Sequence, residues 1–279
     1  MKVGYTVWEW MLYFPDGTIS VPIPGNTRDL FEQSLKDLSD LGYETIENFE
    51  YMLDYYQDAE DEFDSVMKKY NLKFANLYHY MTDDFDTNIE RTKACVEFCK
   101  RHDIHFMNLQ APFRESNDLE VDIKSLEEVC KRANIMGRLA KDADIDICLH
   151  PHFGTVVYYQ NEIDFFAENT DSSCVNFCID TSHSTIAGID PVALINKYIS
   201  RVKYMHLKDV FTNPNGMNEE LIYRFAALGQ GTVDFRGVFD VLRDNNYDGI
   251  VCVECDYPLV NNYQSAQYSR NYLHHVIGI

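Results

Sequence analysis

The 279-residue sequence contains no apolar run of the length needed to cross a bilayer, which is about 18–20 residues. Its first ten residues, MKVGYTVWEW, lack the apolar core and small-residue cleavage site of a secretory signal peptide. No stretch rich in proline, glycine or serine divides the chain, and there is no low-complexity tract. We therefore expect a cytoplasmic protein without a membrane partner, folded as one domain over residues 1–279.

Basic side chains are scarce. The sequence has 24 lysines and arginines against 45 aspartates and glutamates, a formal net charge of −21. Nucleic-acid binding takes most of its affinity from lysine and arginine on phosphates, so we expect no nucleic-acid partner. Gly229 and Gly231 lack the flanking residues of a phosphate-binding loop and are interpreted as turn formers. The negative charge says little about a neutral, sugar-like substrate.

Cysteine pairs at metal-binding spacing are almost absent. Of the eight cysteines, only Cys252 and Cys255 form a CxxC, and they lie on a predicted buried strand. A single CxxC without a second pair is a weak zinc signal. We predict reduced thiols that fill the core, as is usual in the cytoplasm.

Apolar strand-like runs alternate with amphipathic helical patterns, and 46% of the residues are hydrophobic. The predicted strands are Lys2–Val7, Glu44–Phe49, Phe74–Tyr78, His105–Leu109, Ile145–Leu149, Val175–Ile179, Val202–His206 and Ile250–Glu254. The predicted helices are Thr27–Leu41, Glu60–Tyr70, Thr87–His102, Ile123–Asp142, Glu162–Asn169, Pro191–Ile199, Phe235–Asn245 and Tyr263–Val276. Eight strands, each followed by a helix, predict a single α/β domain with the (β/α)8 TIM-barrel fold.

Two helix starts have recognisable caps. Thr87 with Glu90 has the spacing of a capping box. Asp190 followed by Pro191 combines an N-cap residue with a proline in the first helical turn.

The segment after the first strand, residues 8–25, is long and contains Trp8 and Trp10. In a barrel it would overhang the mouth, where long loops often act as lids. Tryptophans are costly to leave in water, so we predict a lid or pocket wall. A surface excursion without function is the alternative.

Four short segments end a strand-like run with side chains that bind metals. They are ICLHPHFGT (147–155), FCIDTSHST (177–185), YMHLKDV (204–210) and VCVECDYP (251–258). Strand ends of one polarity meet on one face of a parallel barrel, so these distant segments are expected to form one site. Imidazoles mixed with carboxylates suit a divalent transition metal.

Each of these residues also has a plainer interpretation. His150 and His152 would share a strand face and are uncommon as a pair unless both are used, but they could be loop histidines. Asp180 could cap the next turn, and His206 alone would be a satisfied core group. Glu254 interrupts a buried run, and a buried carboxylate needs a cation beside it. Together the four segments favour the metal site.

The same segments resemble a known family. LHPHFGT, IDTSH, RVKYMHLKDV, GQGTVDF and DGIVCVE are similar to motifs of the xylose-isomerase-like TIM-barrel group of sugar isomerases, epimerases and dehydratases. Within that group the sequence most resembles inosose (2-keto-myo-inositol) dehydratases. The resemblance is nearly continuous from about Ile145 to Glu254 and weakens before and after. It implies a barrel with one metal site.

The resemblance implies a single divalent metal, with manganese expected first and cobalt, magnesium, zinc or iron as alternatives. Its ligands would be His150, Asp180, His206 and Glu254. Many relatives have a glutamate where this chain has His150. His152 and His183 are therefore kept as alternative ligands.

In related dehydratases the histidine two residues after the first ligand is the base, which makes His152 the expected base here. It would take the proton α to a carbonyl, and His183 or Lys208 would protonate the departing hydroxyl. Related epimerases use two metal-bound glutamates, of which only Glu254 remains, so elimination of water is favoured. For Lys208, an ion pair with Asp209 at the rim is the alternative.

Five further residues are predicted to bind substrate at the barrel mouth: Trp8, Glu47, His79, Gln110 and Arg224. Three of them belong to the second, third and fourth strands or their ends. For these residues, a position behind the substrate or at the rim is the alternative.

The sequence predicts a metal-dependent enzyme that removes a proton next to the carbonyl of a keto-sugar or keto-cyclitol, first an inosose-type dehydratase. A sugar or sugar-phosphate isomerase or epimerase on the same metal is the second hypothesis. A non-catalytic sugar-binding barrel or subunit is the third, and an endonuclease is disfavoured by the charge. The oligomeric state stays open, with a homo-oligomer as a candidate.

Overall fold

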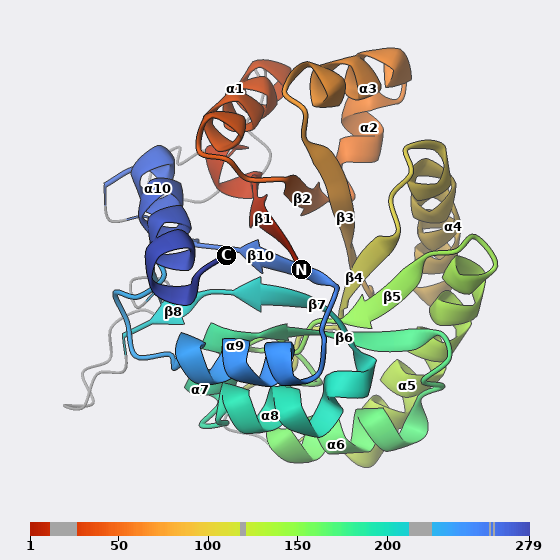
Figure 1. Ribbon diagram of the computed structural model, residues 1–279. Helices are drawn as coiled ribbons and strands as arrows, with labels where there is room; N and C mark the ends of the chain where they lie inside the picture. The colour runs from red at the N-terminus through yellow and green to blue at the C-terminus, as the bar shows by residue number, and fades with distance from the viewer. Residues whose placement is uncertain (12–26, 118–120, 212–224, 257, 259) are drawn as a thin grey trace.

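Parallel strands close into a barrel, and helices surround it (Figure 1). The computed structural model describes residues 1–11, 27–117, 121–211, 225–256, 258 and 260–279. The strand order around the barrel is β1-β10-β7-β6-β5-β4-β3-β2. Neighbouring strands are parallel throughout. The predicted (β/α)8 barrel is confirmed.

The barrel strands begin and end within two residues of their predicted bounds. They are β1 (Lys2–Thr6), β2 (Thr45–Phe49), β3 (Lys73–Tyr80), β4 (Phe106–Gln110), β5 (Asp146–Leu149), β6 (Val175–Asp180), β7 (Val202–Leu207) and β10 (Ile250–Val253). The apolar runs were sufficient to locate them because strands of a parallel barrel are buried on both faces.

The helices pack outside the barrel (Figure 1). They are α1 (Thr27–Asp40), α2 (Met52–Tyr56), α3 (Glu60–Lys69), α4 (Phe85–Arg101), α5 (Ile123–Lys141), α6 (Gln160–Asn169), α7 (Thr181–Ile186), α8 (Pro191–Tyr198), α9 (Phe235–Asp244) and α10 (Asn262–Tyr272). Helix α10 continues into η5 (Leu273–Ile277), and η1 (Trp8–Met11) and η3 (Ile199–Arg201) are short turns. Helices α2 and α7 were not predicted, since they are too short to show a helical period. Among the described helices, none has the length and apolarity that a membrane span requires.

One predicted helix cap is confirmed and one is wrong. Asp190 caps α8 with its side chain, and Pro191 is the first helical residue. The capping box of Thr87 with Glu90 does not form, because α4 begins before Thr87. Instead, Asp84 caps α4 by accepting a hydrogen bond from the N–H of Thr87 at 3.2 Å.

A layer of buried side chains fills the barrel below its mouth. It consists of Ala75, Ile250, Cys148, Cys178, Tyr204 and Cys252. Successive side chains point to opposite sides of a strand, so the residue two positions beyond each of the last four points back into the barrel. This alternation positions the candidate site.

All eight cysteines are buried and free, which confirms the prediction of core-filling thiols. Burial raises the pKa of the Cys255 thiol to about 12, so the CxxC is not a reactive pair at neutral pH. The cytoplasmic location stays a prediction.

A two-stranded hairpin follows β7. Strand β8 (Asp209–Val210) pairs antiparallel with β9 (Phe225–Ala226). The Asp209 carboxylate accepts hydrogen bonds from several backbone N–H groups, including that of Gly229 at 2.9 Å. Gly229 has a φ of +82°, as expected of a turn former. The predicted alternative of a Lys208–Asp209 ion pair is wrong, because successive side chains face opposite sides.

The predicted lid is described only in part. Trp8–Met11 forms η1, and Trp10 packs edge-to-face on Tyr5 with ring centroids 5.5 Å apart. Residues 12–25 lie outside the described residues, so the lid stays a prediction.

Candidate metal centre and active site

The predicted metal ligands come from neighbouring strands in the barrel order. His150 follows β5, Asp180 ends β6, His206 lies in β7, and Glu254 follows β10. Each stands two residues beyond a member of the buried layer below. All four are buried, and the most exposed, Glu254, retains 8% of its accessible surface.

Six buried atoms of this cluster have no hydrogen-bond partner among the described residues. They are Nε2 of His150, Oδ2 of Asp180, Nδ1 and Nε2 of His183, Nδ1 of His206 and Oε2 of Glu254. Asp180 Oδ2 lies 3.5 Å from His150 Nε2 and 3.9 Å from His206 Nδ1. His206 Nδ1 lies 3.0 Å from Glu254 Oε2. Buried polar atoms are seldom left unpaired, and donor atoms of His150, Asp180 and His206 all lie within 4.8 Å of one another, so these three residues fit one divalent cation. Glu254 reaches this group through His206 and stays a candidate fourth ligand.

Hydrogen bonds determine which nitrogen of His150 faces the cluster. The Tyr78 hydroxyl donates to Gln110 Oε1 at 2.9 Å and lies 2.5 Å from His150 Nδ1. Since its proton goes to Gln110, the hydroxyl accepts from Nδ1–H, and we assign that tautomer. The Nε2 lone pair therefore faces Asp180, and such a contact needs a proton or a metal cation between the two atoms. Burial lowers the pKa of His150, which keeps the ring neutral.

Glu47 fixes His206 in the same way. Its Oε1 lies 2.8 Å from His206 Nε2, and its Oε2 accepts from Asn76 at 3.0 Å. Burial opposes a charged ring, but Cys178, Glu47 and Glu254 raise the pKa of His206 well above its ordinary value. His206 Nδ1 therefore holds a proton or a metal cation. Carboxylate–histidine pairs of this kind orient metal ligands, so the contacts favour a role for Glu47 behind a ligand.

Asp180 uses its two oxygens differently. It is the N-cap of α7, and Oδ1 accepts from the backbone N–H groups of Ser182 at 2.7 Å and His183 at 2.8 Å. Oδ2 faces the cluster. Burial opposes ionisation, but Lys208 and His150 lower the pKa of Asp180. The helix cap therefore holds the carboxylate in place while leaving one oxygen for a cation.

Glu254 is held from the pocket side. The Trp8 indole N–H donates to its Oε1 at 3.2 Å, while Oε2 lies 3.0 Å from Lys208 Nζ. Burial opposes ionisation, but Lys208 and His206 lower the pKa of Glu254 well below its ordinary value. Trp8, predicted to bind substrate, therefore also positions a candidate ligand.

Lys208 is a buried cation among carboxylates. Its Nζ lies 2.9 Å from Asp256 Oδ1 and 3.7 Å from Asp180 Oδ2. Burial opposes its charge, but Asp256, Glu254 and Asp180 raise the pKa of Lys208 well above its ordinary value. The ammonium partly neutralises the site.

Two acidic residues of the site were not predicted. Burial raises the pKa of Asp256 to about 7. Glu9 is buried, accepts from the Thr6 hydroxyl at 2.6 Å, and has a pKa raised well above its ordinary value by burial and Glu254. Asp256 stands two residues after Glu254 in VCVECD, a spacing that could have indicated it. Glu9 had no such signal, because it lies in a turn.

His152 and His183 form another side of the cluster. Their ring centroids are 3.9 Å apart. Nδ1–H of His152 donates to the carbonyl oxygen of Phe153 at 2.8 Å, which leaves a lone pair on Nε2. Burial, His150 and Lys208 lower the pKa of His152 to about 3, and burial lowers the pKa of His183 well below its ordinary value. Both rings are therefore neutral at physiological pH.

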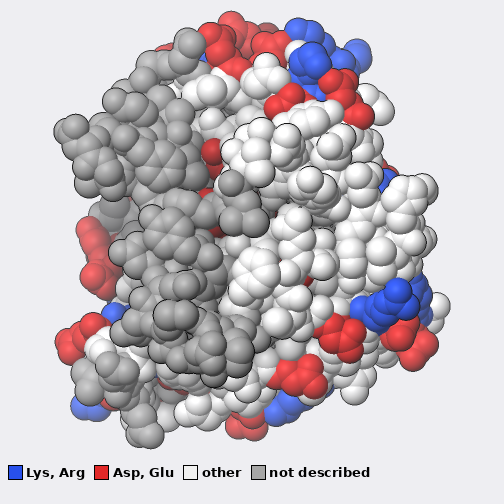
Figure 2. Space-filling model, turned by 90° about the vertical axis from the view of Figure 1, so that its left-hand side faces the viewer, with Lys and Arg blue, Asp and Glu red and all other residues white. Residues whose placement is uncertain are grey.

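A cavity of about 460 Å³ lies at the mouth of the barrel. Its aromatic lining consists of Trp8, Phe49, Tyr51, Tyr78, Tyr80 and Phe113. His150, His152, Gln110 and Glu254 also line it. Among the described residues, its lining includes no lysine or arginine. Figure 2 shows the face toward which β7 and β10 point in Figure 1, with Lys and Arg toward its edges.

One of the predicted substrate-binding residues, His79, is not at this mouth. His79 is wholly buried outside the barrel, against Glu50 and Thr92. Its prediction was wrong because Tyr78 and Tyr80 occupy the inward positions of β3 and alternation turns His79 outward. Arg224 lies outside the described residues.

Comparison with known proteins agrees with this architecture. A model of the xylose isomerase-like TIM barrel family matches residues 35–273, most of the chain.

The chain belongs to the xylose isomerase-like TIM barrel family.

Curated relatives of this family member include inosose dehydratases of several bacteria, among them species of Clostridium. The protein of Clostridium beijerinckii is 35% identical over 156 residues, which are 52% of this chain and 52% of the relative. The protein of Clostridium tetani is 31% identical over 175 residues, 60% of this chain and 58% of the relative. The matched part therefore spans about half the length of the curated relatives.

Solved structures share the fold at low identity. The probable 3-DHS dehydratase AsbF from Bacillus anthracis superposes with a TM-score of 0.76 at 16% identity, covering 99% of each chain. The IolI protein with a bound zinc atom gives a TM-score of 0.76 at 16% identity, covering 99% of this chain and 98% of that one. At such identities, these structures support the family fold alone.

Proposed function

We propose that this chain is a divalent-metal-dependent dehydratase of a keto-cyclitol, with inosose (2-keto-myo-inositol) as the first candidate substrate. The observation that carries the proposal is the convergence of buried donor atoms from four strand ends, of which His150 and Glu254 line a cavity together with a neutral histidine, His152. The curated relatives named inosose dehydratase, 31–35% identical over the matched half, support the reaction class.

The cavity favours an unphosphorylated substrate. Three carboxylate residues, Glu47, Glu254 and Asp256, belong to its lining, which includes no basic side chain among the described residues. A phosphate or carboxylate would therefore enter an acidic pocket without a counter-charge. Aromatic walls suit the C–H faces of a ring, and Gln110 offers an amide for a hydroxyl.

His150, Asp180, His206 and Glu254 would hold the metal, and His183 is an alternative ligand. Their mixed nitrogen and oxygen donors suit manganese, our first candidate, and also cobalt, zinc or iron. When bound, a divalent cation supplies Lewis-acid stabilisation of a carbonyl oxygen.

His152 is the proposed base. Its Nε2 takes the proton α to the substrate carbonyl, and the electron pair of that C–H bond forms the new carbon–carbon double bond as the β C–O bond breaks. The hydroxyl leaves as water after it receives a proton. Lys208 supplies that proton through Asp256, which lines the cavity and contacts the ammonium at 2.9 Å. His183 remains the alternative acid.

His150 explains why elimination is preferred to epimerisation. Epimerisation needs a second base on the opposite face of the substrate. Nδ1 of His150 is bonded to Tyr78, and Nε2 faces Asp180, so neither nitrogen is left to accept a proton from substrate. The location in the cytoplasm, a homo-oligomeric state and the lid at residues 8–25 are further predictions.

The test is a mass-resolved turnover assay with inososes and unphosphorylated ketoses, using full-length protein loaded with manganese or cobalt. The expected product is lighter than its substrate by one water and absorbs in the ultraviolet. His152→Ala should lower kcat by ~10²–10⁴-fold, the typical contribution of a positioned base. Its metal content should not change.

His105→Ala is the matched control, since this histidine is 53% exposed in its side chain and precedes β4. It should leave kcat unchanged. A product of unchanged mass would replace the dehydratase with an isomerase or epimerase. Absence of turnover on all substrates with metal bound would leave a sugar-binding barrel.

A further inference from the structure

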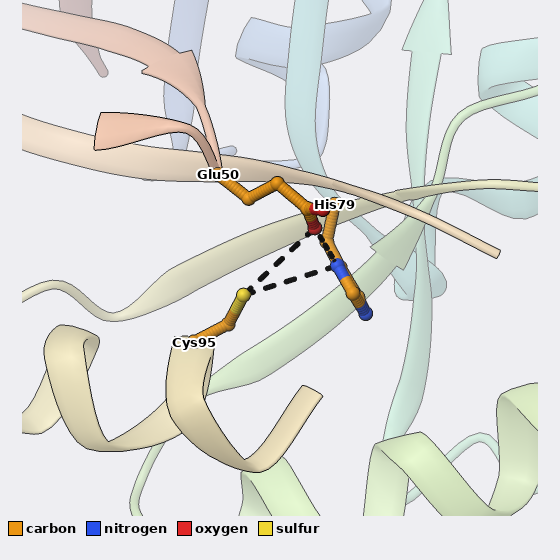
Figure 3. Close-up of side chains that lie close together, drawn as sticks. All are labelled: Glu50, His79 and Cys95. Carbon is orange, nitrogen blue, oxygen red and sulfur yellow. Dashed lines mark hydrogen bonds and ion pairs between the residues drawn. The ribbon is translucent and has the colours of Figure 1, made fainter. Parts of the chain in front are cut away.

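A second group of metal-binding side chains lies outside the barrel. Glu50 follows β2, His79 belongs to β3, and Cys95 belongs to α4; Figure 3 shows their side chains converging between the strand and the helix. His79 and Cys95 are fully buried, and the Glu50 side chain is 19% exposed. Three residue types that bind metals therefore meet at a point that solvent reaches only beside Glu50.

Two of the three donor spacings are close to those around a single cation. Cys95 Sγ lies 3.9 Å from both Glu50 Oε2 and His79 Nδ1, and these two atoms contact each other. On a tetrahedral zinc ion with bonds of about 2.0–2.3 Å, sulfur and nitrogen ligands lie ~3.5 Å apart. Glu50 Oε2 and His79 Nδ1 are in direct contact, so side-chain rotations that separate these two atoms are needed to bring the three donors onto one ion.

The tautomer of His79 turns a nitrogen lone pair toward the cluster. The Thr92 hydroxyl donates to the carbonyl oxygen of Asn88 at 2.8 Å, so it must accept from His79 Nε2–H, also at 2.8 Å. Nδ1 then presents its lone pair to the Glu50 carboxylate. Such a contact needs a positive charge, either a proton or a metal ion. A bonded outer nitrogen is also the usual arrangement of metal-ligating histidines.

Arg91 orients the carboxylate without occupying the cluster. It donates to the carbonyl oxygen of Glu50 at 2.9 Å, and its Nε lies 3.5 Å from Oε1, the oxygen turned away from His79. Both of its terminal nitrogens bond to Asp54, at 2.9 and 2.8 Å, which balances its charge. Although burial opposes it, His79 and Arg91 lower the pKa of Glu50, so this residue is a carboxylate at neutral pH.

We propose that Glu50, His79 and Cys95 form a structural site for one zinc-class divalent cation, separate from the metal centre in the barrel mouth. Water on the exposed side of Glu50 completes the coordination. The thiolate distinguishes this site from the mouth, whose candidate ligands are nitrogen and oxygen atoms only. Cysteine binds metal ions as the thiolate, so binding must release the proton of the Cys95 thiol.

The ion would stabilise one wall of the cavity at the barrel mouth. His79 lies between Tyr78 and Tyr80, and Glu50 lies between Phe49 and Tyr51, all four of which line the cavity. A cation would join the end of β2 and strand β3 to helix α4 behind that wall. The inference does not depend on the proposed reaction, since it concerns metal binding outside the mouth.

Cobalt substitution tests the site on the full-length protein. Thiolate ligation to Co²⁺ gives a charge-transfer band in the near ultraviolet, which nitrogen and oxygen ligands do not. Cobalt-loaded protein should show the band, and the mouth variant His150→Ala/Asp180→Asn should retain it. Cys95→Ser should lose it while still binding one metal ion at the mouth.

Cys99→Ser is the matched control, because Cys99 is buried one helical turn further along α4. It should keep the band. If Cys95→Ser does not fold by circular dichroism, Glu50→Gln, on the exposed side, should weaken cobalt binding at this site at least tenfold. Cobalt-loaded protein without the band would mean that a proton, not a metal ion, lies between His79 and Glu50, and would overturn the proposal. A band that survives in Cys95→Ser would overturn it as well, because another thiol would then bind the cobalt.

Discussion

Three histidines at the barrel mouth each have one ring nitrogen in a polar contact and one without a hydrogen-bond partner among the described residues. The paired atoms are Nδ1 of His150 on Tyr78, Nε2 of His206 on Glu47 and Nδ1 of His152 on Phe153. A bonded nitrogen fixes the tautomer, and the bare one becomes available to a cation or a substrate proton. The hydrogen-bond partner of one ring nitrogen therefore determines whether the other nitrogen can bind a cation or accept a proton.

Replacing Glu47 tests this dependence. Glu47→Ala removes the acceptor from His206 Nε2, which lies 2.8 Å away. We expect metal affinity at the mouth to fall ~10–100-fold, the usual cost of losing such a partner. Competition with a chelator measures it. Glu90→Gln, at an exposed ion pair, should not change the affinity. Equal affinities for Glu47→Ala and the parent protein would show that Glu47 does not orient His206.

Sequence reasoning located the candidate ligands but not their partners. His150, Asp180, His206 and Glu254 each follow an apolar run, so their positions at strand ends could be predicted. Glu47 lies 159 positions before His206, and no local pattern links them. Such partners depend on which strands become neighbours in the closed barrel.

At the scale of elements, strand alternation decides which side chain reaches the mouth. The bounds of β3 were predicted within two residues, yet His79 was assigned to the wrong side. A one-residue change in phase reverses every side chain of a strand. Because strands of a parallel barrel are apolar on both faces, the sequence of β3 does not reveal its phase. Neighbouring strands set it.

Contacts between α6 and α8 predict a pH-dependent contribution to stability. Asp164 accepts from Lys197 at 2.7 Å and also from Tyr198 and Gln160. Burial opposes ionisation, but these donors lower the pKa of Asp164 below its ordinary value of 3.8. Because the pKa of Asp164 is lower in the folded state than in the unfolded state, its ionised form stabilises the fold at pH values above the unfolded pKa. This stabilisation is lost as the pH falls through the folded pKa.

Asp164→Asn should therefore destabilise the protein by ~0.5–1 kcal/mol at pH 7, a value kept small because the side chain is 32% exposed. Urea unfolding at pH 7 and at successively lower pH measures the difference, which should shrink below about pH 4. Asp240→Asn, at a more exposed pair, is the control. A difference that does not change with pH would assign the effect to packing.

At the scale of the whole molecule, the net charge of −21 has a direct consequence. Like charges repel more strongly in the compact state than in the unfolded chain. Salt screens this repulsion, with a Debye length of about 10 Å at 0.1 M. We expect sodium chloride from low concentration to about 0.2 M to raise Tm by ~2–4 °C, which corresponds to about 1 kcal/mol for a chain of this size.

Differential scanning calorimetry in the presence of a chelator measures this effect without a contribution from bound metal. As a control, an uncharged osmolyte at equal osmolality should not reproduce the rise in Tm that sodium chloride produces. A Tm that stays constant or falls with salt would mean that favourable ion pairs outweigh the net repulsion.

The sequence by itself determined the barrel, its strand and helix positions, and the four strand ends that carry the candidate ligands. Those features follow from local period and composition, which act over a few residues. The closed tertiary structure decided which nitrogen of each histidine is bare, that Glu47 stands behind His206, and that His79 meets Glu50 and Cys95 outside the barrel. These contacts join residues distant in sequence, and the register of neighbouring strands and helices alone fixes them.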